Sequence, residues 1–567
     1  MPVAEYHVED KYTYQARHLR VVVIGAGISG IYMGIRIPQV LENIDLVIYE
    51  KNSGVSGTWF ENKYPGCACD VPSHRYTYTF EPNPDWPSYY SDTDSIEKYY
   101  EGIAEKYQVL QYVRLNHAVT AAKWDEESAN WKLSIDRPEG SFDDTCDVLI
   151  NASGVLNKWK WPDIPGLNDF KGKLLHTAHY DRSVPLEGKR VAVIGSGSSG
   201  IQVVATIQKR VAHLGVYIRS PTWIVPPFNM DKAPRHPDGT PDYRYSEAER
   251  KRFREDPQYF AKHRMELEAG STRLFQLLVK GTAYQELIRE TLTRNMSAIL
   301  DARPGLAEKM IPKFAVGCRR ITPGTGFLEA LVKDNVEPIF GNIDRFTEKG
   351  IVSEDGTEVD YDVIICATGF DVSFGARFPF VGRDGRQMDH AYAEDPKSYL
   401  SLAIGGFPNH FIFNGPSSPI GNGSVVPAIE TEGEYMIQCI RKIQTEDIKT
   451  MCIKDEAVEE FVCHVDTYMP RMVWTDNCRS WYKNGKVNGR VTALWPGSAY
   501  NFIKVITTPR YEDYNYTYTN PLSRFSFLGT GKSKEEVESD DISGYLETRM
   551  VLTDGHPALK LLAAATL

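Results

Sequence analysis

Two glycine-rich loops in this chain have the composition of a dinucleotide-binding turn. The first, Gly25-x-Gly27-x-x-Gly30, follows the apolar run RVVVI and precedes a helical sequence. Glycines at these positions allow a tight turn, a close approach of backbone N–H groups to a pyrophosphate, and close packing of helix on strand. The next apolar run, DLVIYE, ends at Glu50, whose carboxylate can accept hydrogen bonds from ribose hydroxyls. These residues predict a site for FAD or NAD.

The second loop repeats the pattern but has a different residue after its second strand. Gly195-x-Gly197-x-x-Gly200 follows RVAVI, and the run HLGVYIRS then carries Arg219 where the first unit has Glu50. A guanidinium can bind a 2′-phosphate through two hydrogen bonds, whereas a carboxylate repels it. The second loop therefore predicts an NADP site. The alternative is that Arg219 is only an exposed residue at the end of a strand.

The elements around these loops predict an α/β fold with two Rossmann-like dinucleotide-binding domains, one for FAD and one for NADP. The chain is expected to leave and re-enter the first domain at the apolar runs 147–155 and 362–371. The expected order is a first FAD part at 1–157, an NADP part at 158–370, and a second FAD part with a C-terminal loop and tail at 371–567. A charged segment with helical spacing, about 229–310, predicts a helical insertion in the NADP part.

Composition and charge narrow the class of function. Of the 567 residues, 42% are hydrophobic and 25% are charged, which is ordinary for a soluble globular protein. The formal net charge of −11 opposes nucleic-acid binding, which needs a basic face. The N-terminus has early acidic residues, and the apolar run 21–35 is too short to span a bilayer. We expect a cytoplasmic protein that binds neither nucleic acid nor a membrane and has no obligatory protein partner.

The nine cysteines form no recognisable pattern. No CxxC is present, and the closest pair, Cys67 and Cys69, has no further cysteine or histidine to complete a zinc site. We therefore expect no metal, and we expect all nine to be reduced thiols. The missing CxxC also argues against dithiol reductases, which carry two nucleotide loops as well.

Several separate motifs together resemble the Baeyer–Villiger monooxygenases. These flavoproteins have FAD and NADP domains and insert one oxygen atom of O2 beside a ketone carbonyl, which gives an ester or lactone. The resemblance covers most of the chain, from about Arg20 to Gly529. It implies FAD and NADP(H) as cofactors, a ketone and O2 as substrates, and a peroxide at the flavin C4a carbon as the oxidant.

The family fingerprint is Phe-x-Gly-x-x-x-His-x-x-x-Trp followed by Pro or Asp. It is matched at Phe170, Gly172, His176 and Asp181, with Tyr180 in place of the tryptophan. The large aromatic side chain should keep its packing role. We interpret His176 as a hydrogen-bonding residue at the junction of the domains; direct proton transfer and metal binding are the alternatives.

A second signature implies residues beside the flavin. The run GTWFENKYPGCACD matches the family's active-site aspartate at Asp70, for which a simple turn residue is the alternative. The resemblance implies cofactor contacts at the following positions: Gly57, Thr58, Trp59, Asp70, Tyr76, Val119, Ser198, Ser199 and Gln202, besides the six loop glycines.

The stretch VGCRRITPGTG resembles the one that carries the family's catalytic arginine. It implies that Arg320 is catalytic, with Asp70 as its orienting partner, and that Arg319 lies near the NADP phosphate. An adjacent surface pair of arginines is the alternative. By a looser match, the resemblance implies that Trp481 takes the place of a cofactor-contacting tryptophan on a mobile loop; a core or surface tryptophan is the alternative.

The proposed chemistry requires a fixed positive charge. A flavin peroxide that attacks a carbonyl is an anion, and an arginine can stabilise it because the guanidinium keeps its proton. Two rival functions are a flavin monooxygenase that oxidises sulfur or nitrogen, and a redox sensor that has lost turnover. The tyrosine-rich runs near both ends are interpreted as packing or surface residues, with pocket lining as the alternative.

Overall fold

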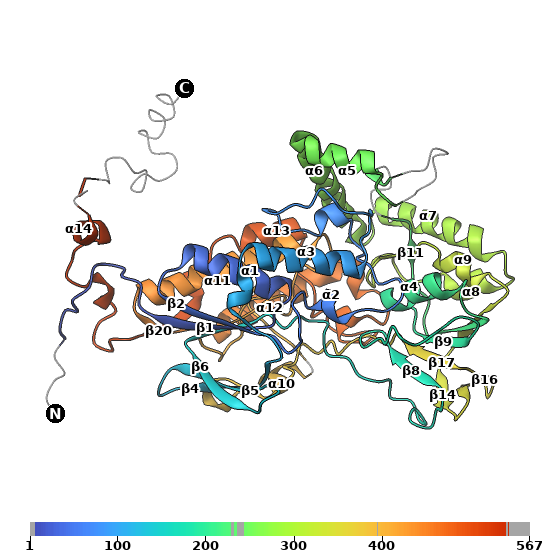
Figure 1. Ribbon diagram of the computed structural model, residues 1–567, viewed down its shortest axis with the longest axis horizontal. Helices are drawn as coiled ribbons and strands as arrows, with labels where there is room; N and C mark the ends of the chain where they lie inside the picture. Colours follow the sequence, from blue (N-terminus) through green and yellow to red (C-terminus); the bar gives the residue numbers. More distant parts are fainter. Residues whose placement is uncertain (1–5, 228–231, 235–242, 394, 540–541, 544–567) are drawn as a thin grey trace.

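The computed structural model describes residues 6–227, 232–234, 243–393, 395–539 and 542–543. Two five-stranded parallel sheets lie side by side along the long axis of the molecule, the first on the left and the second on the right in Figure 1. The predicted α/β fold of two Rossmann-like units is confirmed.

The first sheet has the strand order β19-β7-β1-β2-β3, and all its neighbours are parallel. Its strands are β1 (Leu19–Ile24), β2 (Ile44–Tyr49), β3 (Val113–Arg114), β7 (Val148–Asn151) and β19 (His410–Ile412). Successive residues of β1 point to opposite faces: Val21 and Val23 join one apolar core, and Val22 and Ile24 join another. Both faces of this sheet are therefore covered, as parallel sheets require.

Helices and an antiparallel sheet provide the two covers of the first sheet (Figure 1). The helical side contains α1 (Ile28–Val40), α3 (Thr93–Lys106) and α11 (Val425–Thr445). The antiparallel side contains β4 (Ala118–Asp125), β5 (Asn130–Asp136), β6 (Phe142–Cys146) and, parallel to β4, the short β18 (Phe380–Val381). Further along the chain lie α10 (Met388–Tyr392), β20 (Ile448–Ile453), α12 (Asp455–Tyr468), α13 (Ala499–Val505), β21 (Tyr514–Tyr518) and α14 (Lys534–Glu538).

The second sheet has the order β13-β10-β9-β17-β8 and is also parallel throughout. Its strands are β8 (Lys173–His176), β9 (Arg190–Ile194), β10 (His213–Ile218), β13 (Val336–Phe340) and β17 (Val363–Cys366). Helix α4 (Ser198–Ile207) connects β9 to β10, and α9 (Phe327–Leu331) packs against it. The strands β14 (Ile343–Phe346), β15 (Gly350–Ser353) and β16 (Glu358–Asp360) form a small antiparallel sheet nearby.

The chain crosses between the two halves at two places that lie side by side. Trp159 forms a bridge with Phe370, and the N–H of Asp371 donates to the carbonyl of Lys158 at 2.7 Å. β7 is the last strand of the first sheet before the outgoing crossover, and β17 is the last strand of the second sheet before the return. The two linkers are therefore hydrogen-bonded to each other.

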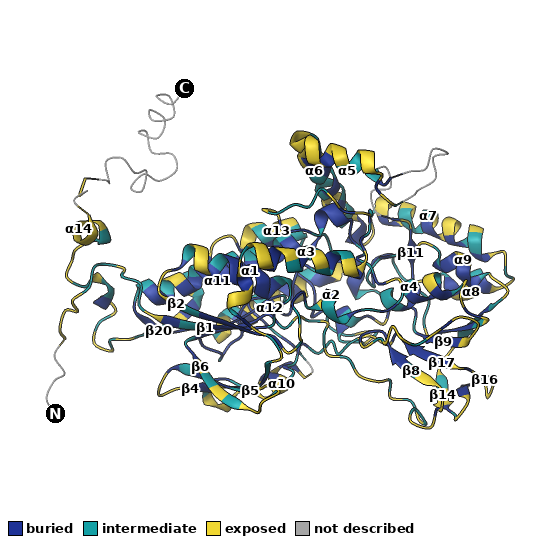
Figure 2. Ribbon diagram, in the orientation of Figure 1, coloured by how far each residue is buried: buried dark blue, intermediate teal, exposed yellow. Residues whose placement is uncertain are grey.

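Helices occupy much of the segment predicted as a helical insertion; residues 229–231 and 235–242 of that segment lie outside the described residues. Its elements are α5 (Glu247–Glu255), α6 (Pro257–Arg273), the 3-10 helix η4 (Leu274–Leu278), α7 (Ala283–Leu300) and α8 (Leu306–Met310). Ser246 begins α5 with a reciprocal capping box to Glu249. The outer faces of α5 and α6 are exposed, while their inner faces pack on the first half (Figure 2).

The expectation that all nine cysteines are reduced is wrong. Cys318 and Cys478 form a disulfide across 160 residues, with their Cα atoms 6.4 Å apart, and the other seven are free. Spacing along the chain could not reveal this pair, because only the tertiary fold brings the two segments together. The bond joins the Cys-Arg-Arg stretch to the loop that carries Trp481.

Candidate active site

The first and last glycines of the first loop, Gly25 and Gly30, have no room for a side chain. Gly25 has φ +101°, and a Cβ there would lie 2.8 Å from the carbonyl oxygen of Ala152. A Cβ on Gly30 would overlap the carbonyl oxygen of Gly25, and a Cβ on Gly57 would lie 2.9 Å from the Cα of Gly27. The Gly-Thr-Trp turn thus packs directly on the loop, and this close backbone cradle fits a dinucleotide.

Glu50 is held against the first loop by the backbone. Its side chain is buried, and its two carboxylate oxygens accept from the N–H groups of Ala26 and Asn52, both at 2.8 Å. Burial raises the pKa of Glu50, and these two hydrogen bonds oppose that rise. The N–H of His117 donates to the Glu50 carbonyl, so Val119, at the start of β4, follows within two residues of this site.

The second loop has the same positive φ at its first glycine, but no described atom covers its middle glycine. Gly195 has φ +113°, and a Cβ there would lie 2.5 Å from the carbonyl oxygen of Ala367. A Cβ on Gly200 would overlap the carbonyl oxygen of Gly195. A Cβ on Gly197, in contrast, would meet no described atom within 4 Å. The middle glycine therefore faces open space above the start of α4, where Ser198 and Ser199 form the first turn.

Two arginines lie beside this open loop. Arg219 follows directly after β10 and is exposed, and Nη1 of Arg319 donates to the carbonyl of Pro221 at 3.1 Å. Burial lowers the pKa of Arg319, and the positive charge of Arg219 lowers it further. Neither arginine forms an ion pair with a carboxylate of the described chain. Two neighbouring, unneutralised guanidiniums are suited to bind a dianionic phosphate.

Gln202 connects the two halves. Its Oε1 accepts from the Tyr64 hydroxyl at 2.8 Å, and its Nε2 donates to the carbonyl of Ala68 at 2.9 Å. A Cβ on Gly66 would overlap the hydroxyl of Thr206, so the Tyr-Pro-Gly turn of the first half lies tightly on α4 of the second. Gln202 thus uses its amide for contacts within the protein, and its expected contact with a cofactor stays a prediction.

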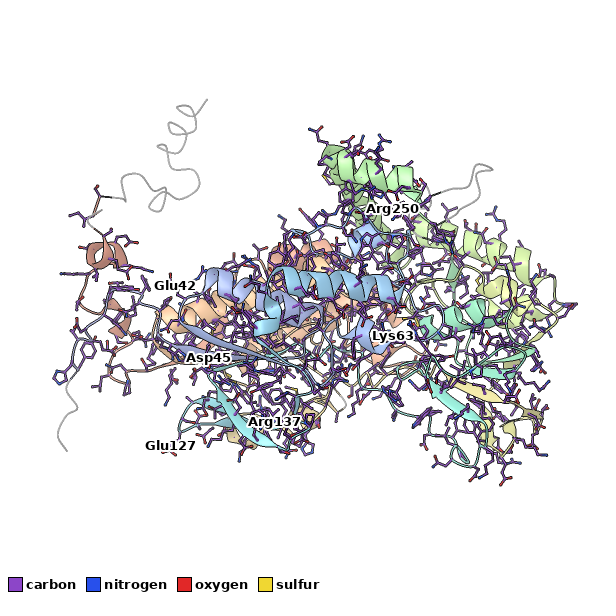
Figure 3. The ribbon with its side chains drawn as sticks, in the orientation of Figure 1. Glu42, Asp45, Lys63, Glu127, Arg137 and Arg250 are labelled. Carbon is purple, nitrogen blue, oxygen red and sulfur yellow. A yellow bond between two sulfur atoms is a disulfide. The ribbon has the colours of Figure 1, made fainter. Side chains whose placement is uncertain are left out.

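Charged side chains reinforce the same junction. Asp94 of α3 accepts from Nη1 and Nη2 of Arg182, both at 3.1 Å, and from Nζ of Lys63, also at 3.1 Å. Lys63 lies just below α3, where the two halves meet (Figure 3). The first and second halves are therefore linked by packing, by an amide bridge and by ion pairs.

Asp70 and Arg320 meet across 250 residues. Nε and Nη2 of Arg320 donate to the two carboxylate oxygens of Asp70 at 2.7 and 2.6 Å, and Nη1 donates to the carbonyl of Ile420 at 3.2 Å. The charge of Asp70 raises the pKa of Arg320 above its ordinary value, against the effect of burial. The guanidinium is therefore permanently charged and fixed in a two-point pairing.

A pocket opens beside this pair. Its apolar wall includes Val71, Leu274, Leu278 and Ile321, so η4 of the insertion contributes part of the lining. Asp70 and Arg320 both border it, with side chains 16% and 35% exposed. None of the described lining residues comes from the tyrosine-rich runs near the chain ends. A small apolar molecule would thus meet a fixed cation in this pocket.

Trp59 and Tyr76 pack together near Asp70. Trp59 lies in the short helix α2 (Thr58–Glu61), and its Nε1 donates to the Tyr76 hydroxyl at 3.3 Å. The two rings are nearly perpendicular, with centroids 5.5 Å apart. Burial raises the pKa of Tyr76, so this hydroxyl stays protonated. The expected contact of Trp59 and Tyr76 with a flavin stays a prediction.

In the loop that carries Trp481, the residue beside Arg320 is Tyr482 rather than Trp481. Trp481 is partly buried and packs on Tyr482 with ring centroids 4.8 Å apart. The buried Tyr482 lies beside the Arg320–Asp70 pair: burial raises its pKa to about 12, while Arg320 lowers it by charge and hydrogen bonding. No local pattern pointed to Tyr482, because its place beside Arg320 depends on how the 3-10 helix η8 (Trp481–Lys483) packs against a distant segment.

His176 ends β8 and faces the returning linker. Its Nδ1 accepts from the N–H of Ala178 at 3.1 Å, so the proton is on Nε2, which lies 3.2 Å from the hydroxyl of Thr368. The ring stacks on Trp159, with centroids 4.6 Å apart, and burial lowers the pKa of His176 to about 4. These contacts agree with the interpretation of His176 as a hydrogen-bonding residue at the junction of the two halves. Tyr180 packs against the main apolar core, as expected for the fingerprint aromatic.

Among the described residues, no three histidine, cysteine, aspartate or glutamate side chains are arranged to hold a metal ion. Within the same part of the chain, no helix has the length and apolar character needed to cross a bilayer.

Comparison with known proteins identifies the family. A family model described as flavin-binding monooxygenase-like matches residues 18–234. The FAD-binding monooxygenase tazF of Aspergillus terreus is 41% identical over 539 residues, which are 94% of this chain and 95% of that protein. A Baeyer–Villiger monooxygenase of Pseudomonas aeruginosa is 34% identical over 517 residues, 90% of this chain and 94% of that one.

Solved structures agree with this relationship. An oxidised steroid monooxygenase bound to NADP is 28% identical and superposes with a TM-score of 0.73, covering 88% of this chain and 100% of that one. A closed structure of cyclohexanone monooxygenase, 24% identical, shares the fold with a TM-score of 0.74 over 89% of this chain and 100% of that one. The resemblance inferred from the motifs is confirmed, and the chain belongs to the flavin-binding monooxygenases of the Baeyer–Villiger type.

Proposed function

We propose that this protein oxidises a ketone to an ester or lactone, with FAD and NADPH as cofactors and O2 as the oxygen source. The observation that supports this most is the two-point pairing of Arg320 with Asp70 beside an apolar pocket. Asp70 comes from the first half of the molecule and Arg320 from the second, so the pair lies where the two nucleotide-binding units meet.

Each glycine loop fits one cofactor. The closed backbone of the first loop and the Glu50 carboxylate suit the pyrophosphate and ribose of FAD. The open second loop, with Arg219 and Arg319, suits the 2′-phosphate of NADP(H). When bound, NADPH supplies a hydride and the flavin activates O2.

Arg320 would act on the charge that develops during oxygen transfer. Attack on a carbonyl carbon moves negative charge from the attacking oxygen, which uses its electron pair to form the new C–O bond, to the carbonyl oxygen. Arg320 can stabilise that charge because its guanidinium keeps its proton and is already oriented by Asp70. A preorganised charge in a pocket with little water stabilises an anion far more than the same charge in bulk water.

The test is oxygenation by the purified, yellow holoenzyme. We expect NADPH consumption to rise with cyclic, aryl or polycyclic ketones, and the product to gain one oxygen atom by mass spectrometry. Labelled O2 should place the label in the ester. A protein that oxidises only sulfides or amines in the same panel would instead be a heteroatom monooxygenase.

Two variants supply the controls. Arg320→Ala should reduce ester formation by about 10²–10³-fold while the flavin stays bound. Arg345→Ala, which removes an exposed arginine whose ion pair in the described part of the chain is with Asp344, should leave ester formation unchanged. Equal loss in both variants would contradict the proposed role of Arg320.

A further inference from the structure

A second guanidinium borders the pocket beside Asp70 and Arg320. Arg75 ends the short 3-10 helix η1 (Ser73–Arg75), and its side chain is only 4% exposed. Nη2 donates to the Glu268 carboxylate at 2.9 Å, and Nη1 donates to the Ser271 hydroxyl. Both partners belong to α6 of the helical insertion. Nothing in the proposed oxygen transfer requires a second cation here.

Arg75 has hydrogen-bonding capacity left over. Its side chain carries five N–H hydrogens, and only two of them have an acceptor in the described part of the chain. Nε is buried without a partner among those residues. The Glu268 side chain is 45% exposed, so water screens part of its negative charge. A ligand oxygen in the pocket would therefore gain a strong donor.

Arg75 and Arg320 are close enough to hold one small molecule. Ile420 accepts from Arg320, and a Cβ on Gly423 would lie 3.9 Å from Nη2 of Arg75. The Cα atoms of Ile420 and Gly423 are three steps apart along the chain, which is at most about 11 Å even when fully extended. Because both guanidiniums also border the same pocket, a bicyclic or larger ketone can reach both.

We propose that Arg75 determines substrate specificity by binding an anionic oxygen, a carboxylate or a phenolate, on the part of the ketone that does not react. This inference rests on the proposed function, since Arg320 is taken as the group beside the reacting carbonyl. The apolar wall would hold the carbon skeleton between the two cations. The substrate class is therefore an acidic ketone rather than a plain hydrocarbon one.

The test compares matched aryl ketones with the holoenzyme. One ketone carries a carboxylate on the ring, one carries an acidic phenol, and one carries a methyl group at the same position. Wild-type kcat/KM should favour each anionic ketone over the methyl analogue by about 10–100-fold, as expected for a hydrogen bond to a charged group. The two anionic arms separate carboxylate from phenolate recognition. Absence of any preference in the wild type would overturn the inference.

Variants of Arg75 and Glu268 distinguish a role in ketone recognition from a purely structural role. Arg75→Met should reduce the preference for the anionic ketones over the methyl analogue to within about 3-fold. Arg75→Lys should keep part of this preference. Glu268→Gln should increase it, because a competing anion is removed. If Arg75 only anchors the insertion, Arg75→Met and Glu268→Gln should both impair all three ketones equally, and the inference fails. Should Arg75→Met not fold, Glu268→Gln alone still decides by the direction of its change.

Ketone dissociation constants, measured from the flavin absorbance of the oxidised holoenzyme with NADP+, keep the two proposals distinguishable. A binding preference for the anionic ketones that Arg75→Met removes would support the role of Arg75 even if no ester forms. In that case the proposed oxygenation would fail and the assigned recognition site would stand.

Discussion

The two glycine loops have the same tight backbone turn, but the residues around the two turns differ. Gly25 and Gly195 both have positive φ, and the last glycine of each loop lies directly on the carbonyl of the first. The middle glycines differ: Gly27 is covered by the turn at Gly57, whereas Gly197 faces open space. The residue after the second strand of each unit differs too: Glu50 is buried and hydrogen-bonded, whereas Arg219 is exposed.

This difference matches two modes of binding. A closed loop with a buried, satisfied carboxylate suits a cofactor that stays bound through many turnovers. An open loop with exposed cations suits a nucleotide that enters and leaves, since charge on the surface speeds association. The proposed chemistry depends on the contact between the halves, where Asp70 of one meets Arg320 of the other.

The largest expected effect comes from breaking that contact. Arg320→Ala should reduce ester formation by about 10²–10³-fold, because one preorganised charged stabiliser is lost. FAD should stay bound, since the first loop is untouched, and NADPH should still be consumed with release of hydrogen peroxide. Product mass spectrometry and a peroxide assay measure both outcomes. Asp70→Ala should reduce ester formation less than Arg320→Ala does. If Arg320→Ala still forms ester at more than about a tenth of the normal rate, Arg320 is not the stabiliser, and Arg319 is the next residue to test.

The second effect concerns the covalent tie between the Arg320 stretch and the Tyr482 loop. Cys478→Ser should lower the free energy of unfolding by about 2–4 kcal/mol, because the disulfide closes a very long loop. Thermal unfolding with bound FAD measures this change, and alkylation of the denatured but unreduced protein should find the other seven cysteines as thiols. Cys463→Ser, which removes an exposed free thiol, is the matched control. An unchanged melting temperature in Cys478→Ser would argue against a stabilising disulfide.

The third effect tests the charge difference between the loops. Arg219→Ala should raise the KM for NADPH by about 10–100-fold and leave the KM for NADH nearly unchanged, because a charge-assisted hydrogen bond contributes about 1.5–3 kcal/mol. Glu50→Ala is the mirror variant and should instead lower the FAD content of the purified protein, since two backbone N–H groups lose their acceptor. Equal efficiency of wild-type protein with NADH and NADPH would refute the assignment of Arg219.

The smallest effect is a pH dependence of stability at the junction. The folded pKa of His176, about 4, lies below its ordinary 6.5, so the unfolded chain binds the extra proton first as the pH falls. His176 should therefore destabilise the fold by about 1 kcal/mol between pH 7 and pH 5.5, and its contribution should level off below pH 4. Denaturant unfolding of wild type and His176→Gln at both pH values measures the difference.

The same variant tests the function of His176. His176→Gln should slow both flavin reduction and oxygenation, with FAD still bound and no new pH dependence of the rate. Loss of one limb of the pH–rate profile would show instead that His176 transfers a proton during turnover.

Local features of the site could be predicted because they depend on short stretches of chain. Three glycines at fixed spacing after an apolar strand dictate a turn whatever the rest of the molecule does, and Gly25 and Gly195 adopt the expected positive φ. Glu50 and Arg219 follow directly after their strands for the same reason. The α/β fold and the insertion follow from the periodicity of those strands and helices.

Contacts between distant segments were decided by the tertiary structure alone. The resemblance implied that Asp70 orients Arg320, but only the packing of two halves brings their side chains to 2.6 Å. The Cys318–Cys478 bond, the place of Tyr482 rather than Trp481 beside Arg320, and the bridge made by Gln202 had no local signal. The physical reason is that the glycine loops are fixed by backbone sterics within a few residues, whereas these contacts depend on how two separately folded sheets are oriented and joined.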